Sequence, residues 1–125
     1  MILDTNALSA LLAQDPMLIR VIQNVPELSL PVIVLGEYRF GVSQSKHRAE
    51  YAAWLTRDLH LFSILPIVEE TTRHYAQIRL ELKRKGTPIP ANDAWIAALA
   101  RQHRLEVVSR DSHFDVVFQV KRIAF

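Results

Sequence analysis

The chain has 125 residues, of which half are apolar and 22% are charged, and it contains no cysteine. This length and apolar content predict a single domain over residues 1–125 with a sizeable core, and they exclude intrinsic disorder. The lack of cysteine excludes a disulfide scaffold, a thiol nucleophile and cysteine-ligated metal sites. No apolar run approaches the roughly 18 residues of a membrane span, and no secretory signal precedes the domain. We therefore expect a soluble cytoplasmic protein without a membrane partner.

Short apolar runs alternate with helical patterns along the chain. Five runs predict strands, at residues 1–3, 28–30, 63–68, 106–109 and 118–123. Helical patterns lie between them, over residues 7–12, 16–25, 31–40, 46–61, 69–85 and 92–102, with a turn at 111–115. This alternation predicts an α/β fold, a three-layer sandwich in which helices cover both faces of a parallel sheet of about five short strands.

Residues with special backbone preferences predict some helix boundaries. Thr5 or Asn6 is expected to cap the first helix, and Asn92 is expected to cap the last long one. Gly36 and Gly41 fall inside a helical pattern, where glycine is costly. We therefore expect close packing of that helix against a neighbour.

Four acidic residues stand at element ends or beside apolar sequence: Asp4, Glu37, Asp93 and Asp111. Asp4 and Asp111 follow predicted strands, and ligand sites in parallel sheets form at the carboxyl ends of strands. Clustered carboxylates repel one another unless a cation compensates. Mg²⁺ and Mn²⁺ prefer oxygen ligands, and such ions can promote phosphodiester hydrolysis.

Each acid also has an ordinary structural interpretation. Asp93 suits a helix cap, Asp111 a turn, and Glu37 a half-exposed helix position. Asp4 is harder to explain in this way, because an acid directly after a buried strand needs a partner. The residues alone therefore leave a metal site and separate structural roles about equally favoured.

Other residues favour structural roles. The histidines show no ligand spacing and are expected at the surface or half-buried: His47, His60, His74, His103 and His113. The aromatic residues Tyr38, Tyr51, Trp54 and Trp95 lie in apolar helical patterns that indicate core positions. The run 83–85 is interpreted as a solvated basic helix end. No glycine-rich phosphate-binding or serine-hydrolase motif occurs.

Four motifs in chain order resemble the PIN-domain family, particularly the VapC-type toxins of bacterial toxin–antitoxin pairs. They are residues 1–9 (MILDTNALS), 36–41 (GEYRFG), 90–98 (PANDAWIAA) and 109–114 (SRDSHF). The resemblance implies a ribonuclease that depends on Mg²⁺ or Mn²⁺ and has a five-stranded parallel sheet. Removing the four motif acids leaves nine acidic residues against 15 basic ones, an excess that suits RNA phosphates.

The resemblance also assigns roles to residues. Asp4, Glu37, Asp93 and Asp111 match the family's acidic quartet, in which Asp4, Asp93 and Asp111 would hold the metal and Glu37 would orient water or act as a base. Thr5, Asn6 and Ser109 match positions that support the acids or the water. Asp115 is an additional nearby acid whose place in the pattern stays open.

The expected partners are RNA and a small antitoxin that inserts into the acidic cleft. An apolar groove near residues 36–41 and 46–61 would receive the antitoxin, and a homodimer is a further expectation. Three alternatives stay open: a phosphate-accepting receiver domain, a catalytically silent PIN-like interaction module and a housekeeping RNA-processing nuclease. The receiver is disfavoured because Asp4 has no acidic neighbour and no lysine follows the fourth predicted strand.

Overall fold

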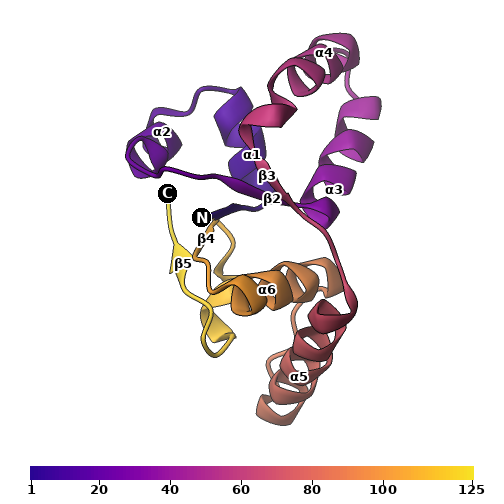
Figure 1. The fold of residues 1–125 in the computed structure, drawn as a ribbon, viewed down its shortest axis with the longest axis vertical. Helices are drawn as coiled ribbons and strands as arrows, with labels where there is room; N and C mark the ends of the chain where they lie inside the picture. The colour runs from indigo at the N-terminus through magenta and orange to yellow at the C-terminus, as the bar shows by residue number, and fades with distance from the viewer.

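A five-stranded parallel sheet forms the centre of the computed structural model, which describes residues 1–125 (Figure 1). The strands are β1 (Ile2–Leu3), β2 (Ser29–Pro31), β3 (Ser63–Leu65), β4 (Val107–Val108) and β5 (Arg122–Ile123). Their order across the sheet is β3-β2-β1-β4-β5, and all neighbours run parallel. The predicted α/β class is confirmed.

Helices cover the two faces of this sheet. They are α1 (Thr5–Leu12), α2 (Pro16–Ile22), α3 (Val32–Ser43), α4 (Arg48–Asp58), α5 (Glu69–Lys85) and α6 (Ala91–His103), with 3₁₀ turns η1 (Leu59–Leu61) and η2 (Ser112–Val116). From β1 the chain adds β2 and then β3 on one side of β1, and it then crosses back to add β4 and β5 on the other side. Right-handed crossovers therefore place α1 to α4 on one face and α5 and α6 on the other (Figure 1). None of these helices has the length and apolar character needed to cross a membrane.

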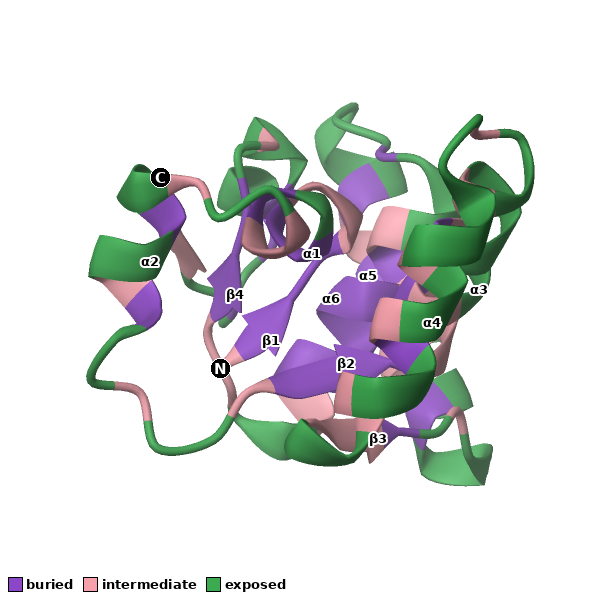
Figure 2. Ribbon diagram, turned by 90° about the horizontal axis from the view of Figure 1, so that it is seen from above, coloured by how far each residue is buried: buried purple, intermediate pink, exposed green.

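One cluster of 26 buried apolar residues joins the sheet to both helical layers. The strands lie at its centre, between the helices (Figure 2). Every residue from Ala94 to Ala100 in α6 is buried except the half-buried Trp95. A helix that is apolar on nearly all sides must be surrounded, and α6 packs against α5, α3 and η2. The start of α6 is thereby held against the edge of the sheet.

Several predicted elements are longer than the strands and helices that the structure shows. β3 ends at Leu65, because the following Pro66 cannot donate a backbone hydrogen bond to a sheet. The region before β5 turns through Gln119, whose φ of 61° is left-handed and interrupts any strand. The predicted helix 46–61 is α4 followed by the separate turn η1.

Two of the predicted helix caps are wrong. Asp4, and neither Thr5 nor Asn6, caps α1, where its Oδ1 accepts a hydrogen bond from the Ala7 backbone N–H at 3.0 Å. Because β1 leads into α1 without a loop, the last residue of the extended segment becomes the cap. At α6 the N-cap position belongs to Pro90, which leaves Asn92 within the first turn.

The prediction of close packing at Gly36 and Gly41 is also wrong. Both glycines are exposed, and no atom lies within 4 Å of the position that a Cβ would take at either. They belong to the outer face of α3, so packing does not require glycine there. Gly86, by contrast, ends α5 with a φ of 72°, a conformation that glycine adopts without strain.

Candidate active site and metal centre

Asp4, Asp93 and Asp111 come together at the carboxyl edge of the sheet. Asp4 directly follows β1, Asp111 follows β4, and these two strands pair. Asp93 lies in the first turn of α6 and carries no capping hydrogen bond. The connections that leave β1 and β4 move to opposite sides, which makes this the switch point where parallel sheets bind ligands.

Asp4 is held firmly inside this edge. Its side chain is only 4% exposed, and both carboxylate oxygens accept hydrogen bonds. Oδ1 accepts from the Ala7 backbone, and Oδ2 accepts from Asn6 Nδ2 at 3.0 Å and from the Ser109 hydroxyl. The orientation of this carboxylate is therefore fixed by its neighbours from β1, α1 and β4.

Burial raises the pKa of Asp4 to about 6, while the hydrogen bonds from Ser109 and Ala7 lower it in part. The negative charges of Asp93 and Asp111 raise the pKa further. Ionising Asp4 is thus costly in the protein alone. A bound cation would remove that cost.

Ser109 and Asn6 connect the two strand ends on which the aspartates stand. The fully buried Ser109 hydroxyl donates to Asp4 and accepts from Asn6 Nδ2 at 3.3 Å and from the Asp111 backbone N–H at 2.8 Å. The Asn6 carbonyl oxygen accepts from the Arg110 backbone N–H at 3.0 Å. These contacts set the spacing between Asp4 and Asp111.

His113 contacts the two other aspartates, and no residue spacing in the sequence indicates this. Its Nδ1 lies 2.8 Å from Asp93 Oδ2 and 3.0 Å from Asp111 Oδ1. The pKa of His113 is raised, mainly by its hydrogen bond to Asp93. The pKa of Asp93 is also raised, mainly by burial. His113 is exposed, as expected for the histidines, but its ring lies against two of the predicted site acids.

The donors at this edge fit a divalent cation. One ligand atom each from Asp93, Asp111 and His113 lie within 4.8 Å of one another. Asp4 lies outside that group of three, but it is near enough for the charges of Asp93 and Asp111 to raise its pKa, and its buried carboxylate has no cationic partner in the chain. Divalent ions such as Mg²⁺ and Mn²⁺ prefer carboxylate oxygens, and Mn²⁺ also accepts imidazole nitrogen.

Glu37 makes no direct contact with the three aspartates in the hydrogen bonds and ion pairs of the structure. It is half-buried on α3. It lines a groove of about 270 Å³ together with Thr5 from α1 and Tyr51 from α4. The buried Tyr38 hydroxyl borders the same groove and has no hydrogen-bond partner.

Asp115 has a structural role. Its carboxylate receives two hydrogen bonds from Arg122, from Nε at 2.7 Å and from Nη2 at 2.8 Å. These bonds lower the pKa of Asp115, and Arg122 also donates to the Ser109 carbonyl at 3.1 Å. Asp115 thus orients an arginine that braces the strand end carrying Ser109.

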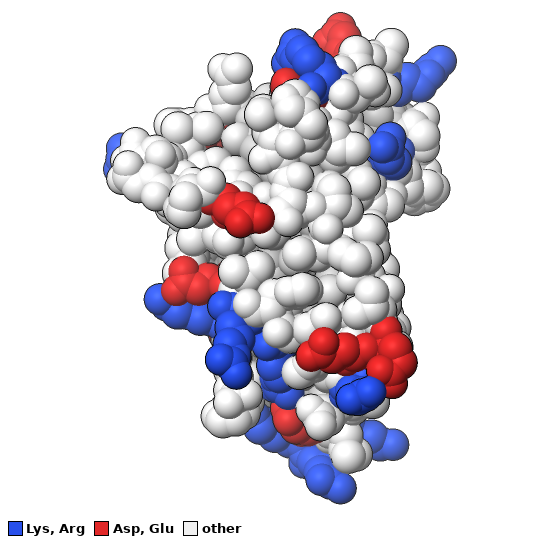
Figure 3. Space-filling model, in the orientation of Figure 1, with Lys and Arg blue, Asp and Glu red and all other residues white.

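Basic side chains without acidic partners gather at the end of α5. Lys83, Arg84 and Lys85 are exposed and form no ion pair, and blue atoms dominate this end of the molecule in Figure 3. Since the short connection after Lys85 leads directly to α6, this run lies at the end of the helix pair that carries Asp93.

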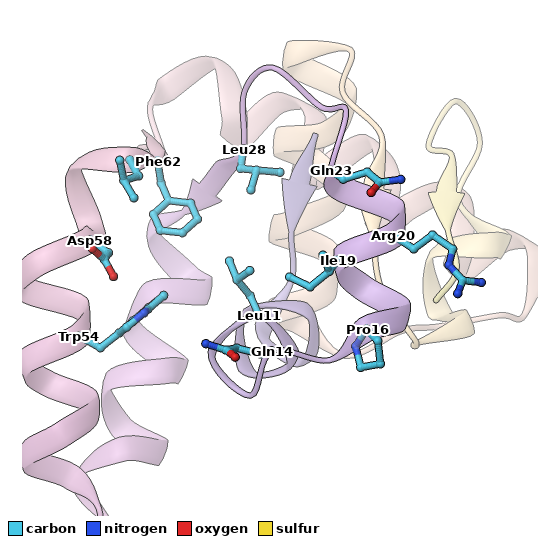
Figure 4. A pocket seen from close by; sticks show the side chains of 11 residues that line it. Leu11, Gln14, Pro16, Ile19, Arg20, Gln23, Leu28, Trp54, Asp58 and Phe62 are labelled. Atoms are coloured by element: carbon cyan, nitrogen blue, oxygen red, sulfur yellow. The ribbon is translucent and has the colours of Figure 1, made fainter.

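The largest groove, about 860 Å³, lies away from the acids. Leu11 and Ile19 face Trp54 and Phe62 across it, and none of the four predicted site acids lines it (Figure 4). Trp54 is only half-buried, although the sequence favoured a core position for it. This face of the molecule therefore offers apolar surface beside α1.

The fold and the aspartate arrangement define a PIN domain, and comparison with known proteins agrees. The sequence profile of the PIN domain matches residues 1–118, so the chain belongs to the PIN-domain family. Toxin FitB from Neisseria gonorrhoeae is 36% identical over 122 residues, which cover 89% of this chain and 87% of FitB. Ribonuclease VapC5 from Mycobacterium tuberculosis is 33% identical over 86 residues, which cover 66% of this chain and 63% of VapC5.

Solved structures also resemble this chain. In the crystal structure of VapBC-5 from M. tuberculosis, a member of the VapBC family of toxin–antitoxin systems, one chain matches with a TM-score of 0.76 and 30% identity. The match covers 99% of this chain and 97% of that one. The family resemblance of the four sequence motifs is confirmed, and the receiver-domain alternative is excluded.

Proposed function

We propose that this protein is a divalent-metal-dependent endoribonuclease and the toxin of a toxin–antitoxin pair. The observation that carries the proposal is the convergence of Asp4, Asp93 and Asp111, which are far apart in sequence, at the switch point of the sheet. Similar chains named as a ribonuclease and a toxin support it. A nuclease that acts on cellular RNA would work in the cytoplasm.

Asp4, Asp93 and Asp111 would hold the ion, which we take to be Mg²⁺ or Mn²⁺. When bound, such an ion activates water and offsets the charge that develops on the phosphate. Ser109 and Asn6 hold Asp4 in one orientation and keep it from rotating away from the site. Glu37, across the groove from Thr5, would orient the attacking water or accept its proton.

The substrate would bind through its phosphates. The unpaired basic residues at the end of α5, the helix that precedes α6 in the chain, would supply such contacts without reading sequence. RNA in single-stranded or loop form suits the site better than duplex, because the scissile phosphate must approach carboxylates at the edge of a sheet.

The test is cleavage of a labelled structured RNA by wild-type protein and by Asp93→Asn, with Mg²⁺, with Mn²⁺ and with chelator. We expect cleavage only by the wild type and only with an ion, while circular dichroism shows both proteins folded. Chelator-insensitive cleavage, or undiminished cleavage by Asp93→Asn, contradicts the assignment. A folded protein that binds the ions and RNA but never cleaves would instead be the silent PIN-like module.

An antitoxin would restrain the nuclease by covering its acids. The groove beside Glu37 opens toward Thr5, next to Asp4, and is bordered by α3 and α4, the helices from which such a groove was predicted. An arginine or lysine of the antitoxin could form charge-assisted hydrogen bonds with the site carboxylates. The similarity to a chain of a toxin–antitoxin complex supports this partner.

A further inference from the structure

His113 occupies a position within the proposed metal centre, although the resemblance of its motif assigns it no role. Its Nδ1 approaches Asp93 Oδ2 to 2.8 Å and Asp111 Oδ1 to 3.0 Å. The three side chains offer ligand atoms that all lie within 4.8 Å of one another. The two carboxylates come from different elements, α6 and the end of β4, so His113 joins them at one point.

The fold fixes the imidazole there. Asp111 begins the η2 turn, and its Oδ1 accepts the backbone N–H of His113 at 2.9 Å. The next residue, Phe114, is fully buried and anchors the turn in the core. With both sides of His113 held in this way, its ring is directed toward the aspartates even though the ring itself is partly exposed.

The spacing of His113 Nδ1 from the two carboxylate oxygens suits coordination of one ion. Ligands that sit about 2.0–2.2 Å from a metal ion are roughly 3 Å from their neighbours in octahedral or tetrahedral geometry. The observed separations of 2.8 and 3.0 Å from nitrogen to the two oxygens fall at this distance. No large movement of the side chains is needed to place an ion between them.

We propose that His113 Nδ1 is a direct ligand of the ion, together with Asp93 and Asp111, and that this nitrogen makes the site favour Mn²⁺ over Mg²⁺. The inference rests on the metal centre of the proposed nuclease. Mg²⁺ strongly prefers oxygen ligands and retains its waters, whereas imidazole suits transition ions. A site of carboxylates alone would discriminate less between the two ions.

The same contacts have a second interpretation, in which the imidazole only acts as an internal cation that neutralises Asp93 and Asp111 when no metal is bound. The two interpretations predict opposite effects of removing the ring. Loss of a ligand weakens Mn²⁺ binding, whereas loss of a competing cation strengthens the binding of both ions. The direction of the change in affinity therefore decides between them.

The experiment is calorimetric titration of metal-free protein with MnCl₂ and separately with MgCl₂, at one pH and salt concentration. We expect His113→Ala to weaken Mn²⁺ binding on the order of tenfold or more, and Mg²⁺ binding much less. His113→Asn places an amide oxygen near the position of Nδ1, so it should retain Mg²⁺ binding while it lowers the Mn²⁺ preference. The matched control is His103→Ala, which removes an exposed histidine at the opposite end of α6 from Asp93 and should change neither affinity.

A spectroscopic titration with Co²⁺ provides a readout that does not depend on RNA cleavage. Loss of the nitrogen ligand should shift the visible bands of the Co²⁺-loaded protein in both His113 variants and leave them unchanged in His103→Ala. Unchanged bands, or unchanged or tighter Mn²⁺ binding by both His113 variants, overturn the proposal. If the wild type still cleaves RNA in that case, the proposed nuclease function stands without His113 as a ligand. If ion binding depends on His113 but no RNA is cleaved, the ligand proposal stands and the nuclease function is refuted.

Discussion

Asp4 combines a structural and a chemical role in one side chain. It caps α1 through the Ala7 N–H and at the same time faces the charges of two other aspartates. A cap alone is satisfied by Ser, Thr or Asn, none of which carries a charge. A buried charge at this position is costly to the free protein, so the metal site accounts for the carboxylate better than capping does.

The first prediction follows from the pKa of Asp4. Its value of about 6 in the folded protein exceeds the ordinary value of 3.8, so the native state holds this proton more tightly than the unfolded chain. The resulting destabilisation is absent below about pH 4, develops as the pH rises, and is complete above about pH 6, where it amounts to roughly 3 kcal/mol. Asp4→Asn abolishes this penalty.

The measurement is denaturant unfolding of both proteins in chelator at several pH values. The free energy of unfolding of Asp4→Asn relative to wild type should rise between pH 4 and pH 6.5 and then level off. Comparing the two proteins removes the contributions of the other titrating groups. A relative stability that does not change with pH would show that Asp4 is ionised without cost.

Glu37 gives the second prediction. Because it is half-buried on α3 and joined to none of the aspartates, its substitution should leave the metal centre intact. Glu37→Gln keeps the size of the side chain, so we expect a large loss of turnover, on the order of 100-fold if it serves as the base, with little change in RNA affinity. Single-turnover cleavage and RNA binding in Ca²⁺ measure the two effects. Unchanged turnover would return Glu37 to a purely structural role.

At the scale of elements, α3 carries glycine where packing does not need it. Gly36 is helical and exposed, with open space at its Cβ position. Gly36→Ala should therefore stabilise the protein by about 0.5–1 kcal/mol, measured as a higher midpoint of chemical denaturation. The control is Gly86→Ala at the end of α5, where the φ of 72° makes alanine strained and the same substitution should destabilise. A destabilised Gly36→Ala would mean that the glycine is needed for the shape of α3.

The sequence predicts every element of this fold in the correct order, because the apolar runs and helical periodicity reflect burial directly. Element ends are less predictable, since they depend on tertiary context: Asp4 caps α1 only because β1 leads straight into it. The meeting of Asp4 and Asp111 follows from a parallel sheet, but the position of His113 does not. Its approach to Asp93 depends on the conformation of η2 and on the packing of α6, neither of which a residue pattern encodes.

At the scale of the whole molecule, apolar side chains stay at the surface. Phe40 is 67% exposed, Leu61 66% and Phe118 64%. Scattered apolar residues are common on monomers, but exposed aromatic side chains such as Phe40 and Phe118 suit contacts with other chains. The predicted homodimer stays a prediction, and sedimentation of the purified protein over a range of concentrations tests it. A single monomeric species at all concentrations would contradict it.

The last prediction concerns the effect of the whole protein on a cell. A free nuclease of this kind should arrest growth when it is expressed in a bacterial host without its antitoxin, because it cleaves the cell's own RNA. Asp93→Asn should not arrest growth, since its site loses one of the negative charges that hold the ion, and matched protein levels on an immunoblot make the comparison valid. Gly36→Ala serves as the control, because it alters α3 away from the aspartates and should remain toxic. RNA that is cleaved in vitro while wild-type expression leaves growth unaffected would favour the housekeeping RNA-processing nuclease. The assignment of nuclease activity to the aspartate site would then stand, and only the proposed role as a toxin would be contradicted.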